Sequence, residues 1–172
     1  IGHVTNGVHT ASYVGPAFRP LLDRYVGENW LDLHPEDPAW EKVQDIPDSE
    51  FWSARRAQKQ TLIDALRERL PLCSAYSDIT GDEREQWLSA LNQDALIIGF
   101  ARRFAPYKRA TMLFADPDRL ARLLNDPKRP TVLIMAGKAH PADTKGIELI
   151  EDVVRWSRDP RFYGKIFFVE NY

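Results

Sequence analysis

Three short apolar runs divide the second half of the chain, at residues 95–101, 131–136 and 166–169. Each run has the length and the branched or aromatic side chains of a buried strand. The stretches between them repeat apolar residues at helical spacing and predict helices at about 107–114, 117–125 and 147–157. Strands that alternate with helices favour a parallel sheet with right-handed crossovers. The pattern therefore predicts an α/β fold.

The first half of the chain predicts mainly helices. The clearest one begins near Asp48 or Ser49, since either residue can cap it, and ends near Leu70, before Pro71. Its buried stripe is expected to comprise Phe51, Ala54, Leu62, Ala65, Leu66 and Leu70. Shorter helices are expected at 20–25 and 81–91, with the Pro-containing segment 31–47 running over the surface. Residues 1–94 should thus form a helical lead-in to a strand–helix core at 95–172.

A cluster of cations follows the first predicted strand. Arg102, Arg103, Lys108 and Arg109 gather around a turn that contains Pro106, and no acid occurs between Ala95 and Ala115. Open α/β sheets bind ligands at the carboxyl ends of their strands, and a helix beginning there would add amide donors and a favourable dipole. Arginine forks and a lysine charge suit phosphate oxygens. The segment predicts an anion site, with an ordinary solvated charged loop as the alternative.

The second predicted strand also ends in a polar loop, at residues 137–143. It should lie on the same edge of the sheet, where Lys138 and His140 can hold a ligand, although the spacing is not that of a Walker motif. The four histidines lack metal-ligand spacing, so no metal site is predicted. Tryptophans in the amphipathic segments are expected to pack in the interior: Trp30, Trp40, Trp52 and Trp87.

Composition narrows the class of protein. The chain has 172 residues and a net charge of −2, whereas a nucleic-acid binder would usually be more basic. Cys73 is the single cysteine, which fits a reducing, cytoplasmic compartment. No run of eighteen apolar residues predicts a membrane span. Neither a G-x-S-x-G elbow nor a G-x-G-x-x-G turn occurs, which argues against a serine hydrolase and an ordinary NAD-binding fold.

Four segments carry a family resemblance: VTNGVHT at 4–10, IGFARRFAPYKRATMLF at 98–114, LIMAGKAHPAD at 133–143 and IFFVENY at 166–172. In order and spacing they resemble the α-glucan phosphorylases, in particular the shorter bacterial and archaeal branch. The resemblance implies a glycosyltransferase-B architecture. Residues 1–172 would then be part of its carboxyl-terminal, Rossmann-like domain, and the chain a piece of a longer protein.

The resemblance also implies a reaction and a cofactor. Members of the family cleave terminal α-1,4 glucosyl units with inorganic phosphate, release glucose 1-phosphate, and use pyridoxal 5′-phosphate through its phosphate group. Arg103 and Lys108 match positions that contact the substrate phosphate. Arg102 matches a cofactor-phosphate contact, and Asn6 matches an asparagine that binds the glucosyl unit. Further cofactor-pocket positions are matched by Tyr13, His140 and Asp143.

The chain departs from the family pattern in places. Pro106 stands where Thr or Glu is common, and Tyr13 stands where Trp is usual. The family's Schiff-base lysine is expected after Tyr172, so this chain alone should be inactive. The alternatives are a nucleotide-sugar glycosyltransferase of the same fold and a non-catalytic glucan-binding module. The hydrophobic strand 166–169 further predicts self-association as a homo-oligomer.

Overall fold

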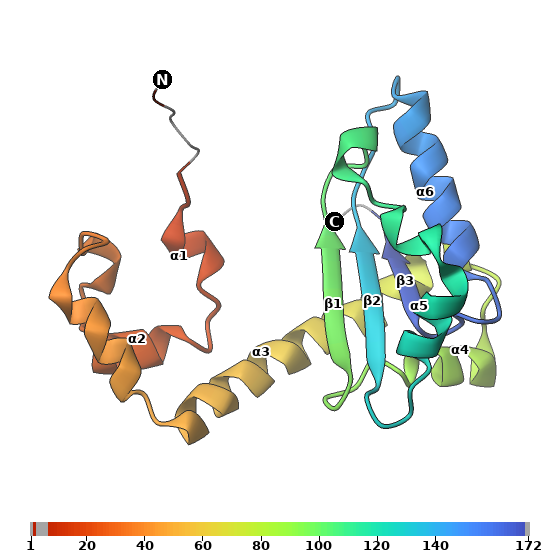
Figure 1. The fold of residues 1–172 in the computed structure, drawn as a ribbon. Coiled ribbons are helices and arrows are strands. Elements are labelled where there is room, and N and C mark those ends of the chain that lie inside the picture. Colours follow the sequence, from red (N-terminus) through yellow and green to blue (C-terminus); the bar gives the residue numbers. More distant parts are fainter. Residues whose placement is uncertain (1, 3–6, 171–172) are drawn as a thin grey trace. The chain divides into compact units, whose positions relative to one another are not determined.

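The structure is a computed structural model that describes residue 2 and residues 7–170 (Figure 1). The chain divides into two compact units, Ile1–Leu62 and Ile63–Tyr172, with the division inside helix α3 (Asp48–Arg69).

The first unit is helical. It holds α1 (Thr10–Tyr13), α2 (Arg19–Tyr25), short 3₁₀ segments and the start of α3. Arg24 pairs with Glu50 at 2.8 Å, and Trp30 donates its Nε1–H to Asp23 at 2.8 Å. The 31–47 segment is mostly exposed as predicted, but it contains an eight-residue 3₁₀ helix, Pro38–Asp45. That helix forms because Asp37 caps it, accepting the Ala39 N–H at 2.9 Å.

The second unit contains the predicted parallel sheet. Strands β1 (Leu96–Ala101), β2 (Thr131–Ala136) and β3 (Ile166–Val169) lie in the order β1-β2-β3, with Ile98 opposite Leu133 and Leu133 opposite Ile166. Helices α5 (Pro117–Leu124) and α6 (Thr144–Ser157) form the two crossovers, and α4 (Gly81–Leu88) precedes the sheet. The strand predictions are confirmed to within one residue. The predicted helices 117–125 and 81–91 are confirmed with slightly earlier ends.

Aromatic side chains fill the core on both faces of β3. Phe167 lies 5.0 Å from Trp87 of α4, between ring centroids, and the next residue, Phe168, lies 5.9 Å from Phe104. Successive residues of a strand point to opposite faces, so each face has its own aromatic contact. Tyr76 packs against Trp87 with ring centroids 4.5 Å apart and ring planes tilted by 54°. Burying each of these rings stabilises the fold by about 1.5–3 kcal/mol.

The outer edge of β3 is closed by the segment that follows α3. The Tyr76 hydroxyl accepts the Phe168 N–H at 2.7 Å, and burial raises the pKa of Tyr76 to about 12. The prediction that strand 166–169 drives self-association is therefore wrong about the surface, because all four of its residues are buried. Exposed apolar side chains of the sheet lie on β1 instead, at Leu96 and Ile98. Self-association itself stays a prediction.

Two predictions about apolar side chains need correction. In α3 the buried residues are Ala54, Ile63 and Leu66, and Leu70 is buried just after the helix ends, while Phe51, Leu62 and Ala65 are exposed. A single stripe fails because the helix belongs to one unit before Leu62 and to the other after it. Trp30 and Trp87 are buried as predicted, whereas Trp40 is half-buried and Trp52 is 59% exposed.

Candidate functional site

The basic turn (residues 102–109) and the loop after β2 meet at the carboxyl edge of the sheet. The Arg102 N–H donates to the Ala136 carbonyl at 3.1 Å, and the Phe104 N–H donates to the Lys138 carbonyl at 2.8 Å. These bonds continue the β1–β2 ladder past the ends of both strands. The prediction that the two segments share one edge of the sheet is confirmed (Figure 1).

The predicted helix at 107–114 is wrong. The chain forms two short 3₁₀ segments, Pro106–Lys108 and Met112–Ala115, and between them Arg109 adopts a left-handed conformation with φ of 56°. The left-handed backbone at Arg109 cannot continue a right-handed helix, so the chain does not run as one α-helix through 107–114. No helix N-terminus therefore follows the turn to support an anion.

The nearest helix start is that of α6, and it carries a carboxylate of its own. Asp143 caps the helix, its Oδ1 accepting the Gly146 N–H at 3.0 Å. This cap is why α6 begins at Thr144 and not at the predicted 147. The Gly146 N–H is thus already bonded, so the positive charge at this edge comes from the side chains of the basic turn.

Those cations have no hydrogen-bonded or ion-paired side-chain partner in the part of the chain that the structure describes. Among these residues, no hydrogen bond or ion pair involves the side chain of Arg102, Arg103, Lys108 or Arg109. Lys108 Nζ lies 4.7 Å from the centroid of the Tyr107 ring. The arginines are exposed and Lys108 is half-buried. Elsewhere in the described part of the chain, arginines are ion-paired with carboxylates, among them Arg24, Arg129, Arg155, Arg158 and Arg161.

The other predicted site residues are spread over both units. His140 is exposed on the loop after β2, and its Nδ1 accepts the Ala142 N–H at 3.1 Å. Tyr13 is 79% exposed at the end of α1, in the first unit. Asn6 lies outside the described residues. The structure therefore brings Arg102, Arg103, His140 and Asp143 to one sheet edge.

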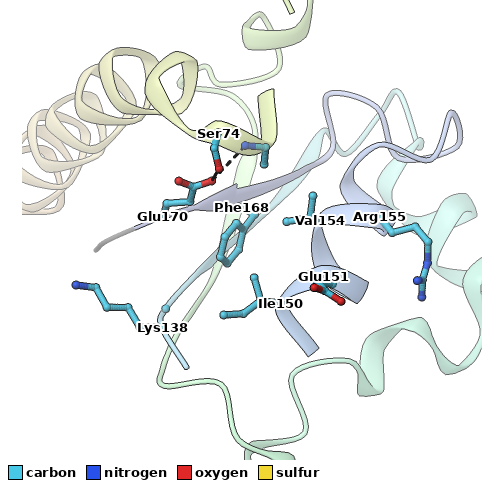
Figure 2. Close-up of a pocket in the computed structure, with 10 residues that line it drawn as sticks. Ser74, Lys138, Ile150, Glu151, Val154, Arg155, Phe168 and Glu170 are labelled. Atoms are coloured by element: carbon cyan, nitrogen blue, oxygen red, sulfur yellow. Dashed lines mark hydrogen bonds between the residues drawn. The ribbon is translucent and has the colours of Figure 1, made fainter. Parts of the chain in front are cut away.

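Beside this edge lies a pocket that the sequence patterns did not reveal. It has a volume of about 560 Å³, an apolar wall of Ile150, Val154 and Phe168, and Lys138 and Glu170 at one end (Figure 2). Glu170 Oε1 accepts two hydrogen bonds, one from Ser74 Oγ at 2.6 Å and one from the Ala75 N–H at 3.2 Å. Partial burial alone would raise the pKa of Glu170, but these hydrogen bonds hold it below its ordinary value.

Sequence reasoning missed this pocket because its walls come from segments about a hundred residues apart. Gly137 and Lys138 belong both to the pocket lining and to the loop after β2, whereas Arg103 and Lys108 do not line it.

Within residue 2 and residues 7–170, no group of three or more His, Cys, Asp or Glu side chains is placed to hold a metal ion. None of the helices in this part of the chain combines the length and apolarity needed to cross a membrane.

Comparisons with known proteins give the chain its relatives, although no protein-family model matches it. It is 37% identical over 185 residues to a glycogen phosphorylase of Aquifex aeolicus, covering 100% of this chain and 25% of that protein. It is 40% identical over 169 residues to a maltodextrin phosphorylase of Thermococcus litoralis, and the match covers 98% of this chain and 20% of that protein. A glycogen phosphorylase of Mycobacterium tuberculosis is 37% identical over 172 residues, and the match covers 100% of this chain and 20% of that protein.

These matches run through the whole chain, so they include both the basic turn and the loop after β2. The chain itself spans only about a fifth to a quarter of the length of these relatives. Identity at this level over the full chain, together with the parallel α/β sheet, shows that the chain belongs to the α-glucan phosphorylase family.

Proposed function

We propose that this chain supplies the phosphate-binding turn of an α-1,4-glucan phosphorylase, which releases glucose 1-phosphate from glucan ends. The family is one of glycosyltransferases whose substrates are glucan and phosphate. The observation that carries the proposal is the basic turn itself. Its four cations lie at the carboxyl edge of the sheet with no acidic partner among the described residues.

Arg103 and Lys108 are the proposed ligands of the attacking phosphate. An arginine fork fixes the orientation of the anion through two parallel hydrogen bonds, and lysine adds a compact charge. Each charge-assisted hydrogen bond contributes roughly 1.5–3 kcal/mol. Held this way, the phosphate is positioned for attack on the glucosyl carbon, and its charge is balanced while the glycosidic bond breaks.

The family uses pyridoxal 5′-phosphate, and the residues at this edge fit its phosphate group. Arg102 is an exposed cation whose backbone is fixed to β2, beside the loop that bears His140 and Asp143. We propose that Arg102 binds the cofactor phosphate, that His140, Asp143 and Tyr13 line its pocket, and that Asn6 binds the glucosyl unit. Bound there, the cofactor supplies a phosphate group that takes part in catalysis.

The similarity to phosphorylases implies that the three-stranded sheet is part of one half of a glycosyltransferase-B architecture. We assign residues 1–172 to the carboxyl-terminal, Rossmann-like half. A nucleotide-sugar glycosyltransferase would use the same turn for a diphosphate. The three relatives are phosphorylases, which favours inorganic phosphate as the anion.

The test is Arg103→Ala in the whole protein that contains this chain. Loss of one charge-assisted contact should lower kcat/KM for phosphate by roughly 10- to 100-fold, with the fold unchanged. Arg129→Ala is the matched control, because Arg129 is an exposed arginine that precedes β2 and pairs with Asp126. Near wild-type activity of the Arg103 variant at limiting phosphate would show that Arg103 is not a ligand of the attacking phosphate.

A second experiment concerns the cofactor lysine, which we place outside this chain. The chain by itself, incubated with pyridoxal 5′-phosphate and then reduced with borohydride, should show no stoichiometric adduct by intact-mass measurement. One full equivalent on a single lysine, such as Lys138, would contradict that placement.

A further inference from the structure

Two glycines of the β2–α6 connection touch the backbone of the basic turn. A Cβ atom on Gly137 would lie 2.1 Å from the Arg102 carbonyl oxygen and 2.8 Å from two ring atoms of Phe104. A Cβ on Gly146 would lie 2.6 Å from the Phe104 carbonyl oxygen and 2.9 Å from the Ala139 Cβ. Neither glycine has a positive φ, so close approach and not backbone conformation requires glycine here.

Within the turn, Phe104 anchors the backbone to the core. This side chain is fully buried, and its ring lies edge-on to Phe100 at 5.8 Å and to Phe168 at 5.9 Å. Its N–H donates to the Lys138 carbonyl at 2.8 Å, while its own carbonyl oxygen faces Gly146. Phe104 directly follows the exposed Arg103. The backbone at Phe104 is therefore anchored to the β2–α6 connection, directly beside the exposed Arg103.

We infer that Gly137 and Gly146 are positioning residues for the anion site, an inference that rests on the proposed phosphate-binding function. Their missing side chains let the β2–α6 connection close on residues 102–104 and set where Arg102 and Arg103 leave the sheet. A methyl group at Gly146 would need about 1 Å of extra space, and a displacement of this size can cost up to about 100-fold in rate.

The chain offers a matched control at Gly99, in strand β1, three residues before Arg102. A Cβ on Gly99 meets no atom within 4 Å, and its φ is not positive. Gly99→Ala therefore makes the same chemical change next to the same turn without pushing on it.

The experiment compares Gly146→Ala, Gly99→Ala and Arg103→Ala in the whole protein, measuring kcat, the KM for phosphate, the KM for glucan and the melting temperature. Gly146→Ala should raise the phosphate KM at least about tenfold and leave the glucan KM within about twofold, because only the anion ligands move. Gly99→Ala should match the wild type in both KM values.

The outcomes separate this inference from the function on which it rests. A Gly146→Ala protein with a wild-type phosphate KM, alongside a defective Arg103→Ala protein, overturns the positioning role alone. A wild-type Arg103→Ala protein overturns the phosphate site and the positioning role together. Should Gly146→Ala fail to fold, Phe104→Leu decides the matter, since it loosens the same anchor without adding atoms. A raised phosphate KM there supports the inference, and an unchanged one overturns it.

Discussion

At the amino ends of the strands Arg129 and Arg161 are ion-paired, whereas at the carboxyl ends Arg102 and Arg103 contact no acid within the described residues. Arg129 lies 2.8 Å from Asp126, and Arg161 lies 3.0 Å from Asp118 and 2.8 Å from Asp159. Both pairs precede a strand, β2 or β3. The same residue type is thus neutralised at one edge of the sheet and left available at the other.

The two edges of the sheet differ in whether carboxylates stand beside their arginines. In the connections before β2 and β3, aspartates stand within three residues of the arginines. Hydrogen bonds from Arg129 lower the pKa of Asp126, and those from Arg161 lower the pKa of Asp159. At the carboxyl edge Asp143 bonds α6 through its Oδ1, and Glu170 accepts hydrogen bonds from Ser74 and Ala75. Exposed cations stay hydrated at little cost, so their attraction remains for an incoming anion.

The largest effect is expected from removing both proposed ligands. Arg103→Ala combined with Lys108→Gln should lower kcat/KM for phosphate by more than about 100-fold, since two charge-assisted contacts disappear. Arg129→Ala combined with Arg161→Ala removes two arginines from the opposite edge and should leave phosphate kinetics unchanged. Equal losses in the two double variants would show that the edges do not differ in function.

Lys108→Gln alone is a finer test. It should raise the KM for phosphate about tenfold and change the KM for glucan far less, because a fixed cation attracts the anion and not the neutral sugar. Initial-rate kinetics with each substrate varied in turn would measure both constants. A defect confined to glucan would take Lys108 out of the phosphate site.

Arg161→Ala tests the amino edge by itself. The variant loses its contacts with Asp118 and Asp159 and its stacking near Trp156, so the melting temperature should fall by no more than about 4 °C. Phosphate kinetics should stay at the wild-type level. Thermal unfolding and steady-state kinetics on one preparation would measure both effects. A loss of phosphate use without a loss of stability would show that Arg161, at the amino edge, serves phosphate binding and not stability.

The smallest effect concerns pH. Because Arg161 holds the pKa of Asp159 below its ordinary value, this pair stabilises the fold above the unfolded pKa of about 3.9, and the contribution is lost as pH falls through the lower folded value. Melting temperatures between pH 7 and pH 3 should therefore drop slightly less for Asp159→Asn than for the wild type. Parallel curves would mean that the pair contributes nothing measurable.

Much of this edge could be predicted from local sequence. Three apolar runs predict the strands, and alternation with helices predicts their parallel order. A parallel order brings all carboxyl ends to one edge, so the basic turn and the loop at 137–143 had to meet. The Phe104–Lys138 hydrogen bond confirms it. The helix assigned to 107–114 failed because apolar spacing alone does not report which side chains the core will bury.

By itself the sequence determined the three strands, their parallel order and the placing of four cations at the carboxyl edge, because strand pattern and turn composition are properties of neighbouring residues. Tertiary structure alone decided the pairing of Arg161 with Asp118, the closure of β3 by Tyr76 and the fit of Gly146 against Phe104. These contacts join residues 42 to 92 positions apart. Their geometry depends on how separate elements pack, which no local pattern encodes.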